Sequence, residues 1–242
     1  MKKSTYQSRM STTEQKYKDW IRTLGDHQGG RIYFSDQTVK SMVLLERLVK
    51  LYAPTVIIEL GTAHGLSTRL WIEQSDARIV CIDASFAALR GTAPVLPVDL
   101  DRLELIEKWV RSVHLQDLWS EDDKVLLYID IHSDHQHVFD AIPDLPNGSV
   151  VLFDDVWRSD RSLKSREEID EFVQEEVIKD IDHTAPKAIW PLKYADYWKR
   201  GGFYGFSEIP QLCMWTAANK VTLHWEKGAK VVWFQWPKDR ED

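Results

Sequence analysis

Short apolar runs alternate with amphipathic stretches along most of the chain. The runs are almost continuously apolar, as is typical of strands in a parallel sheet that is covered on both faces. We expect five such strands, at residues 55–60, 77–85, 102–108, 124–130 and 149–156. Stretches with apolar residues at helical spacing precede and separate them, and predict helices at residues 35–51, 66–73, 111–119 and 134–145. This alternation predicts an α/β fold with a doubly wound, mostly parallel sheet.

The pattern differs at both ends of this core. Residues 12–24 have an amphipathic period and predict an N-terminal helix. Beyond the fifth strand, residues 165–181 predict an acidic amphipathic helix, and residues 186–206 are aromatic and predict mostly irregular structure. Three strand-like runs follow, at residues 211–217, 220–228 and 229–237. The last two are typical of a hairpin, which would add an antiparallel C-terminal edge to the sheet.

Length and charge exclude some classes of protein. The chain has 242 residues, enough for one sizeable α/β domain, and its formal net charge of −7 disfavours nucleic acid as a partner. No apolar run reaches the roughly 18 residues that a membrane span needs, and the start of the chain lacks the apolar core of a secretory signal. Cys81 and Cys213 lie in apolar runs and are expected to be buried thiols. We therefore expect a cytoplasmic protein that binds neither nucleic acid nor a membrane, and a homo-oligomer stays open.

A glycine-bearing turn joins the first strand to the helix after it. Glu59, Gly61 and Gly65 lie in this turn, where glycine lets the backbone approach a ligand and the helix N-terminus favours polar or anionic groups. Asp83 ends the second strand, and an acid there suits the two hydroxyls of a ribose. Because ligands of open α/β sheets bind at the carboxyl ends of the strands, these residues should converge. The G-x-x-x-G spacing departs from the dinucleotide fingerprint and disfavours an NAD-dependent oxidoreductase; a plain structural turn is the other interpretation.

Three carboxylates end the next two strands. Asp130 ends the fourth strand, and Asp154 and Asp155 end the fifth, so all three should gather at one edge of the sheet. Clustered carboxylates repel one another unless a cation joins them. Oxygen ligands suit a hard ion such as Mg²⁺, with Ca²⁺ or Mn²⁺ as alternatives. The other interpretation is that Asp130 caps the following helix and Asp155 caps a turn.

The segment I-E-L-G-T-A-H-G-L-S-T resembles the first motif of class I S-adenosylmethionine-dependent methyltransferases. It is most similar to the form found in small-molecule O-methyltransferases, which include catechol O-methyltransferase-like enzymes and the group named after cephalosporin hydroxylase. The resemblance covers roughly residues 35–157 and implies a Rossmann-like fold. It implies that the turn wraps the methionine part of S-adenosylmethionine and that Asp83 holds the ribose. Relatives have a Gly-Asp-Ser-like stretch near the adenine; this chain has Glu107-Lys108-Trp109 there, and Trp109 is our candidate to stack on the base. The candidate cofactor-binding residues are Glu59, Gly61, Thr62, Gly65, Ser67, Asp83, Trp109 and Asp130.

The same resemblance extends to the carboxylates. In metal-dependent O-methyltransferases an aspartate ends strand four and an acidic or amide pair ends strand five. The implied ligands of Mg²⁺, or of another divalent cation, are Asp130, Asp154 and Asp155.

Histidines beside this edge are candidates for the general base that takes the proton of a substrate hydroxyl. Relatives keep a lysine or histidine three residues after the strand-four aspartate, where this chain has Ser133. His132 is the first candidate, because it lies next to the predicted metal edge, and His135 is the second. Solvent-facing residues at a helix start are the alternative. A zinc hydrolase that also uses His137 would have an uncommon ligand spacing and would leave the glycine turn unexplained.

We therefore expect a single methyltransferase domain that transfers a methyl group to a hydroxyl of a small molecule. Its parts would be an N-terminal arm and helix (1–34), a cofactor-binding core (35–157), and a substrate-wall region with the C-terminal strands (158–242). A sugar, a phenol or a polyketide-type natural product would suit an aromatic wall. Candidates for that wall, which could instead pack under a long loop, are Trp157, Trp190, Tyr194, Tyr197, Trp198 and Tyr204. The alternatives are a methyltransferase-fold binding protein without turnover and a metal-independent N-methyltransferase.

Overall fold

The structure is a computed structural model of the whole chain. It describes residues 11–27, 36–92, 100–131, 135–154, 157–158, 203–204, 212, 215–216, 218–226 and 229–236. None of the helices in these ranges has the length and apolar character needed to cross a bilayer.

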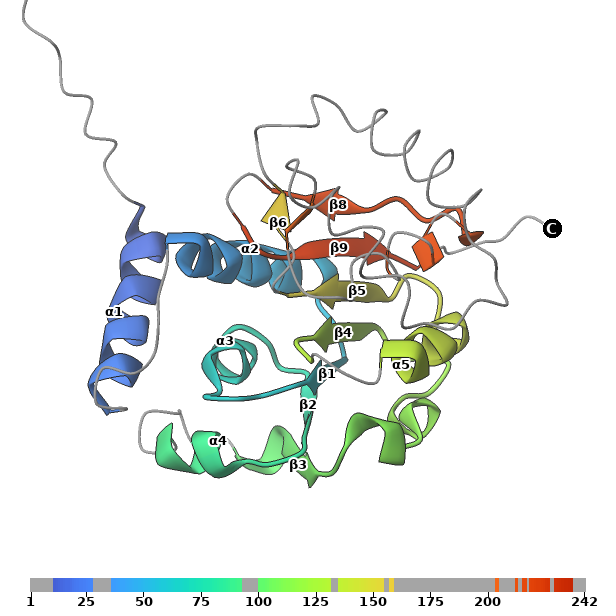
Figure 1. The fold of residues 1–242 in the computed structure, drawn as a ribbon, viewed down its shortest axis with the longest axis horizontal. Helices are drawn as coiled ribbons and strands as arrows, with labels where there is room; N and C mark the ends of the chain where they lie inside the picture. Colours follow the sequence, from blue (N-terminus) through green and yellow to red (C-terminus); the bar gives the residue numbers. More distant parts are fainter. Residues whose placement is uncertain are drawn as a thin grey trace, which may run out of the picture.

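The described strands form one large sheet and one small sheet. The large sheet has seven strands in the order β3-β2-β1-β4-β5-β9-β8 (Figure 1). Their bounds are β1 Val56–Leu60, β2 Arg78–Asp83, β3 Leu103–Glu107, β4 Val125–Ile129, β5 Val150–Phe153, β8 His224–Trp225 and β9 Val232–Gln235. The first five strands are parallel, β9 is antiparallel to β5, and β8 is antiparallel to β9. The predicted doubly wound sheet with an antiparallel C-terminal edge is therefore confirmed, and its strand order reverses between β1 and β4.

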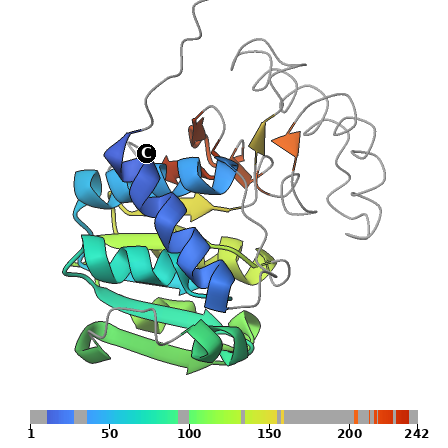
Figure 2. The ribbon, with the colours of Figure 1, turned by 90° about the vertical axis from the view of Figure 1, so that its left-hand side faces the viewer.

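Helices cover both faces of this sheet. Helices α1 to α4 lie on one face and α5 on the other, and α1 crosses over α2 and α3 (Figures 1 and 2). The α-helices are α1 Thr12–His27, α2 Asp36–Tyr52, α3 Leu66–Gln74, α4 Ala87–Thr92 and α5 His135–Ala141. The 3₁₀ helices are η2 Leu100–Arg102, η3 Val110–Ser112, η4 Leu115–Leu118 and η5 Ile142–Asp144.

Two hydrophobic cores explain why the central strands are almost continuously apolar. Ile57 and Leu126 face the core under α1 to α3, whereas Ile58 and Leu127 face the core under α5. All four side chains are almost fully buried. Because successive residues of a strand point to opposite faces, a strand covered on both sides needs an apolar residue at every position.

Two predicted helices are shorter or tighter than expected. The helix predicted at 111–119 is wrong: η3 and η4 lie there, separated by extended backbone at Val113 and His114, a conformation that the β-branched valine favours. The helix predicted at 134–145 ends as an α-helix at Ala141, because Pro143 has no N–H to continue the ladder.

The strand predicted at 211–217 is also wrong where the structure describes it. Leu212, Trp215 and Thr216 are helical, and Asn219 N–H donates to the Trp215 carbonyl at 3.0 Å. Trp215 stacks on Phe234 with ring centroids 5.6 Å apart, so this segment fills the core under α5. The hairpin predicted after it is confirmed by the pairing of β8 with β9.

A small second sheet lies after β5. Strand β6, Trp157–Arg158, pairs antiparallel with β7, Phe203–Tyr204, and Trp157 is opposite Tyr204. Within the stretch expected to be mostly irregular, residues 203–204 thus form a short strand. The helix predicted at 165–181 and the rest of the aromatic stretch lie outside the described residues.

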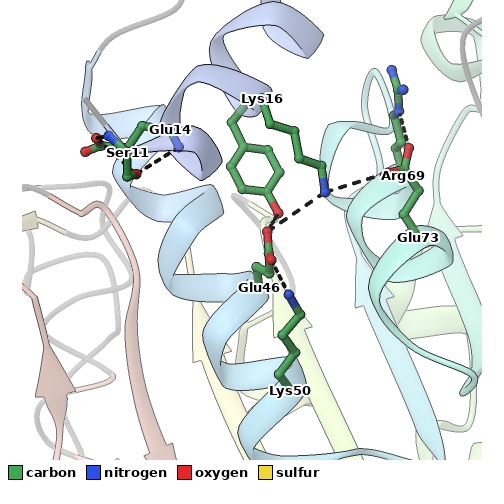
Figure 3. A network of polar contacts seen from close by, with 8 residues as sticks. Ser11, Glu14, Lys16, Glu46, Lys50, Arg69 and Glu73 are labelled. Atoms are coloured by element: carbon green, nitrogen blue, oxygen red, sulfur yellow. Dashed lines mark hydrogen bonds and ion pairs between the residues drawn. The ribbon is translucent and has the colours of Figure 1, made fainter. Parts of the chain in front are cut away.

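A network of charged and polar groups joins α1 to α2 and α3 (Figure 3). The Tyr17 hydroxyl and the Lys50 ammonium both donate to the Glu46 carboxylate. Lys16 lies 3.9 Å from Glu46 and 3.7 Å from Glu73 on α3. Burial alone would raise the pKa of Glu46, but the bonds from Lys50 and Tyr17 and the charge of Lys16 outweigh it and lower that pKa.

We expect acid to weaken this network. The pKa of Glu46 is lower in the folded chain than its ordinary value of 4.5. The ionised carboxylate therefore stabilises the folded chain fully above pH 4.5, and this contribution is lost as the pH falls through the pKa of the folded chain. Glu46→Gln should lower the free energy of unfolding by about 1–2 kcal/mol near pH 7, and by less near pH 3. Urea unfolding at a series of pH values measures this. The exposed Glu121→Gln is the control, and equal pH dependence of Glu46→Gln and wild type would contradict the prediction.

Candidate cofactor and metal site

The turn after β1 approaches the end of β4 so closely that only glycine fits. Gly61 has a φ of 85°, and a Cβ placed on it would lie 2.1 Å from the carbonyl oxygen of Asp130. Asp130 N–H donates to the Leu60 carbonyl at 2.8 Å, and Gly61 N–H donates to the Ile82 carbonyl at 2.9 Å. The ends of β1, β2 and β4 are thus tied together at the point where the strand order reverses, which is where open α/β sheets bind their ligands.

The rest of the turn leads into α3 with an unusual backbone. Ala63 has a φ of 44° and Gly65 a φ of 75°, so left-handed residues recur through the turn. Gly65 N–H donates to the Thr62 carbonyl at 2.8 Å, and α3 begins without a side-chain cap. A non-glycine residue with positive φ costs free energy and persists only where the surrounding structure holds it; such residues are frequent at ligand sites.

Glu59 lies under this turn with its carboxylate inside the protein. The side chain is fully buried and accepts bonds from four donors, which are Ser67 Oγ, Thr68 Oγ1 at 2.5 Å, Trp71 Nε1 at 3.2 Å and Cys81 Sγ at 3.1 Å. Burial raises the pKa of Glu59 although these bonds act in the opposite direction. Three of the donors come from α3, so Glu59 fastens that helix to β1. Its predicted contact with the cofactor, like that of Ser67, stays a prediction.

Asp83 lies against the turn; its predicted role toward the ribose stays a prediction. Its Oδ2 accepts the N–H groups of Thr62 at 2.8 Å and Ala63 at 3.1 Å, and its Oδ1 accepts the N–H of Ser85 at 3.0 Å. Asp83 therefore holds the turn in place. Since a carboxylate oxygen can accept two hydrogen bonds, Oδ1 retains acceptor capacity for a hydroxyl.

Trp109 follows a residue that a backbone hydrogen bond ties to Asp83. Lys108 N–H donates to the Asp83 carbonyl at 2.9 Å, which brings the residue after it to the same edge of the sheet. The Trp109 side chain is 54% exposed, and the Arg111 guanidinium lies 5.3 Å from its ring centroid. An exposed indole beside the expected ribose position is suited to stacking on a base.

Asp130 and Asp154 follow directly after two paired strands. The pairing of β4 with β5 ends at Ile129 opposite Phe153, and Asp154 N–H donates to the Ile129 carbonyl at 2.9 Å. Both aspartates are half-buried. Two carboxylates at one edge, with oxygen donors only, fit the preference of Mg²⁺.

A third carboxylate, imidazole or thiolate ligand would have to come from outside the described residues. Over the described ranges no group of three histidine, cysteine or acidic side chains is arranged to hold a metal ion. Asp155, the predicted third ligand, lies outside those ranges, as do His132 and Ser133. The carboxylates of Asp130 and Asp154 are two oxygen ligands of the kind that Mg²⁺ prefers.

The Tyr128 side chain is a part of this site that sequence reasoning missed. Its hydroxyl donates to Asp154 Oδ2, and the residue is almost fully buried in β4. Burial first, and then the charges of Asp154 and Asp130, raise the pKa of Tyr128 well above its ordinary value. The signal in the sequence was a tyrosine inside an otherwise aliphatic run, V-L-L-Y-I.

The described histidines do not form a metal cluster. His135 is buried, and its Nε2 lies 2.8 Å from the Ile131 carbonyl oxygen. His137 Nε2 lies 2.8 Å from the Val113 carbonyl oxygen. A ring nitrogen that meets a carbonyl must carry the hydrogen, so it neither binds a metal nor accepts a proton. This geometry disfavours the zinc hydrolase, and leaves His135 as base a prediction that depends on its other nitrogen.

Comparisons with known proteins identify the fold. No protein-family model matches the chain, and no curated protein matches it. An O-methyltransferase from Bacillus cereus in complex with SAH is similar in structure, with a TM-score of 0.52, 14% identity, and coverage of 95% of this chain and 93% of that one. The SAH-bound methyltransferase from Podospora anserina is similar with a TM-score of 0.50, 16% identity, and coverage of 94% and 88%. The chain therefore has the Rossmann-like fold of the class I methyltransferases, at an identity too low to carry more than the fold.

Proposed function

We propose that this protein is an S-adenosylmethionine-dependent O-methyltransferase that acts on a hydroxyl of a small molecule and uses Mg²⁺ or a similar divalent cation. The observation that carries the proposal is the close approach of Gly61 to Asp130. It puts the glycine turn beside the two-carboxylate edge, so a cofactor and a cation-held substrate would lie next to each other. The similar structures from two organisms, both with SAH, support the choice of cofactor.

The residues around the turn would bind the cofactor in three parts. The backbone from Gly61 to Gly65 would follow its methionine part, because the glycines at both ends of this stretch have no side chain that could block a close approach. Asp83 Oδ1 would accept a ribose hydroxyl, and Trp109 would stack on the adenine. Thr62 and Ser67, both buried, would support this surface.

The proposed reaction assigns separate roles to the cofactor, the cation and the side chains of the chain. Bound S-adenosylmethionine supplies an electrophilic methyl group, and bound Mg²⁺ supplies positive charge that lowers the pKa of a nearby hydroxyl. Asp130, Asp154 and Asp155 would hold the cation and so orient the substrate oxygen in line with the methyl group, which lowers the entropic cost of the displacement. His132 would take the hydroxyl proton.

The substrate side would be formed by the chain that follows β5. Strand β6 begins at Trp157, two residues after the predicted ligand Asp155, and pairs with β7. The small sheet therefore lies close in sequence to the site, at the end of β5. An aromatic wall there would accept a sugar, a phenol or a polyketide-type natural product.

Calorimetric titration of the full chain with S-adenosylmethionine, with and without Mg²⁺, tests the proposal. We expect binding in the micromolar range or tighter, and Mg²⁺-dependent methylation of hydroxyl compounds that a chelator abolishes. Cofactor binding with no turnover would point to the alternative of a binding protein. Turnover that survives the chelator would refute the metal, and absence of cofactor binding would refute the proposal as a whole.

A further inference from the structure

Tyr128 is the polar side chain of β4, whose other four residues are aliphatic. The strand is buried at all five positions, and Tyr128 is only 2% exposed. If the ring only filled space, a phenylalanine would serve equally well at this position. Instead its hydroxyl donates to Asp154, one of the two described carboxylates at the carboxyl edge.

The tyrosine ring is itself held in one orientation. Trp71 of α3 packs on it edge to face, with ring centroids 5.4 Å apart and an interplanar angle of 69°. Trp71 is fully buried and donates from Nε1 to Glu59 at 3.2 Å, while Glu59 lies opposite Tyr128 in the pairing of β1 with β4. A different χ1 rotamer of either residue would break its hydrogen bond, so the packing and the bond together fix the position of the phenol oxygen.

The bond to Asp154 restricts that carboxylate without using up its capacity. Tyr128 donates one hydrogen to Oδ2, which occupies one of about four acceptor sites on the carboxylate. This bond by itself does not use up the acceptor sites that a cation would need. It ties Oδ2 to a buried phenol and so favours the Asp154 rotamer in which Oδ2 faces Tyr128.

We propose that Tyr128 is a positioning residue that orients Asp154 for the divalent cation. The inference rests on the proposed function, because it assigns a role toward the predicted metal. Groups that hydrogen-bond a metal ligand typically change metal affinity about 10- to 100-fold when removed, because the free ligand must then be ordered on binding.

The test is the Mg²⁺ affinity of Tyr128→Phe, measured by calorimetry on the full chain with S-adenosylmethionine bound. We expect the dissociation constant for Mg²⁺ to rise about tenfold, with cofactor affinity unchanged. Tyr17→Phe is the matched control, because Tyr17 is also a buried phenol that donates to a carboxylate, Glu46, far from this site. It removes the same bond type, so it should lower stability and leave Mg²⁺ affinity as in wild type.

The outcomes separate this inference from the proposed function. If wild type binds Mg²⁺ and Tyr128→Phe binds it equally well, the inference fails and the proposed function stands. If wild type binds no Mg²⁺, both the metal and the role of Tyr128 are refuted. If Tyr128→Phe does not fold, 3-fluorotyrosine placed at position 128 alone decides: Mg²⁺ should shift its fluorine resonance, and an unchanged resonance at saturating Mg²⁺ would overturn the inference.

Discussion

Gly61→Ala is expected to lose cofactor binding together with a large part of its stability. Alanine at a φ of 85° is strained, and its Cβ would lie 2.1 Å from the Asp130 carbonyl oxygen, far inside contact distance. The backbones of the turn and of the end of β4 would have to separate. Strain and overpacking together should lower the free energy of unfolding by about 3 kcal/mol. Because the turn would then be displaced, the variant should bind S-adenosylmethionine at least about tenfold more weakly, a loss of about 1.4 kcal/mol in binding free energy.

Gly148→Ala provides a matched control for this variant. Gly148 also has a φ of 85°, but a Cβ there would meet only Gln235 Nε2 at 3.6 Å, which is ordinary contact. It should therefore cost only the backbone strain, about 1 kcal/mol, and leave cofactor affinity unchanged. Urea unfolding and calorimetry measure the two effects separately. Equal losses in the two variants would show that the approach of Gly61 to Asp130 has no importance of its own.

Asp154→Asn is expected to lose Mg²⁺-dependent turnover and to keep the cofactor. The amide has nearly the shape of the carboxylate and can still accept the Tyr128 hydroxyl, so the fold should be little affected. It lacks the charge that holds a hard cation. Loss of a contribution of several kcal/mol to the transition state corresponds to a turnover at least about a hundredfold lower.

The comparison with Asp140→Asn tests whether the loss is specific. Asp140 is exposed on α5 and accepts a bond from Gln136 at 2.7 Å, away from the carboxyl edge. Its variant should keep both turnover and Mg²⁺ affinity. Wild-type turnover of Asp154→Asn at limiting Mg²⁺ would show that Asp154 is not a metal ligand. Loss of S-adenosylmethionine binding in Asp154→Asn would instead show that the role of Asp154 is structural.

The central sheet could be predicted because burial on both faces leaves a strong signal. Runs such as V-I-I-E-L and V-L-L-Y-I are short, almost continuously apolar and rich in β-branched residues, and their order along the chain implies parallel strands. The segment at 211–217 could not be read in this way, since Leu212 and Trp215 fill the core at helical spacing while the intervening residues are also apolar. Hydrophobic periodicity cannot distinguish a helix from a strand where a segment is apolar at both the helical and the strand spacing.

The candidate site was predictable in its positions but not in its contacts. Strand ends could be located from sequence, and the structure brings the turn, Asp83 and Asp130 together there. No sequence pattern shows that the Glu59 carboxylate is turned inward to α3, because this depends on how α3 packs on β1. Nor does a pattern show that Tyr128 contacts Asp154, because Tyr128 lies in β4 whereas Asp154 follows β5, which is distant in sequence. Pairs of this kind leave no local period.

The pairing of β6 with β7 has a consequence for how new specificities could arise. It returns the chain at Phe203 to the strand that it left at Arg158, so the ends of the intervening stretch meet as neighbours. Insertions between such ends cost little closure entropy, since that cost grows only with the logarithm of length. Substrate preference could therefore change by replacement of the stretch between Arg158 and Phe203. The large sheet that carries the carboxylates would not need to change.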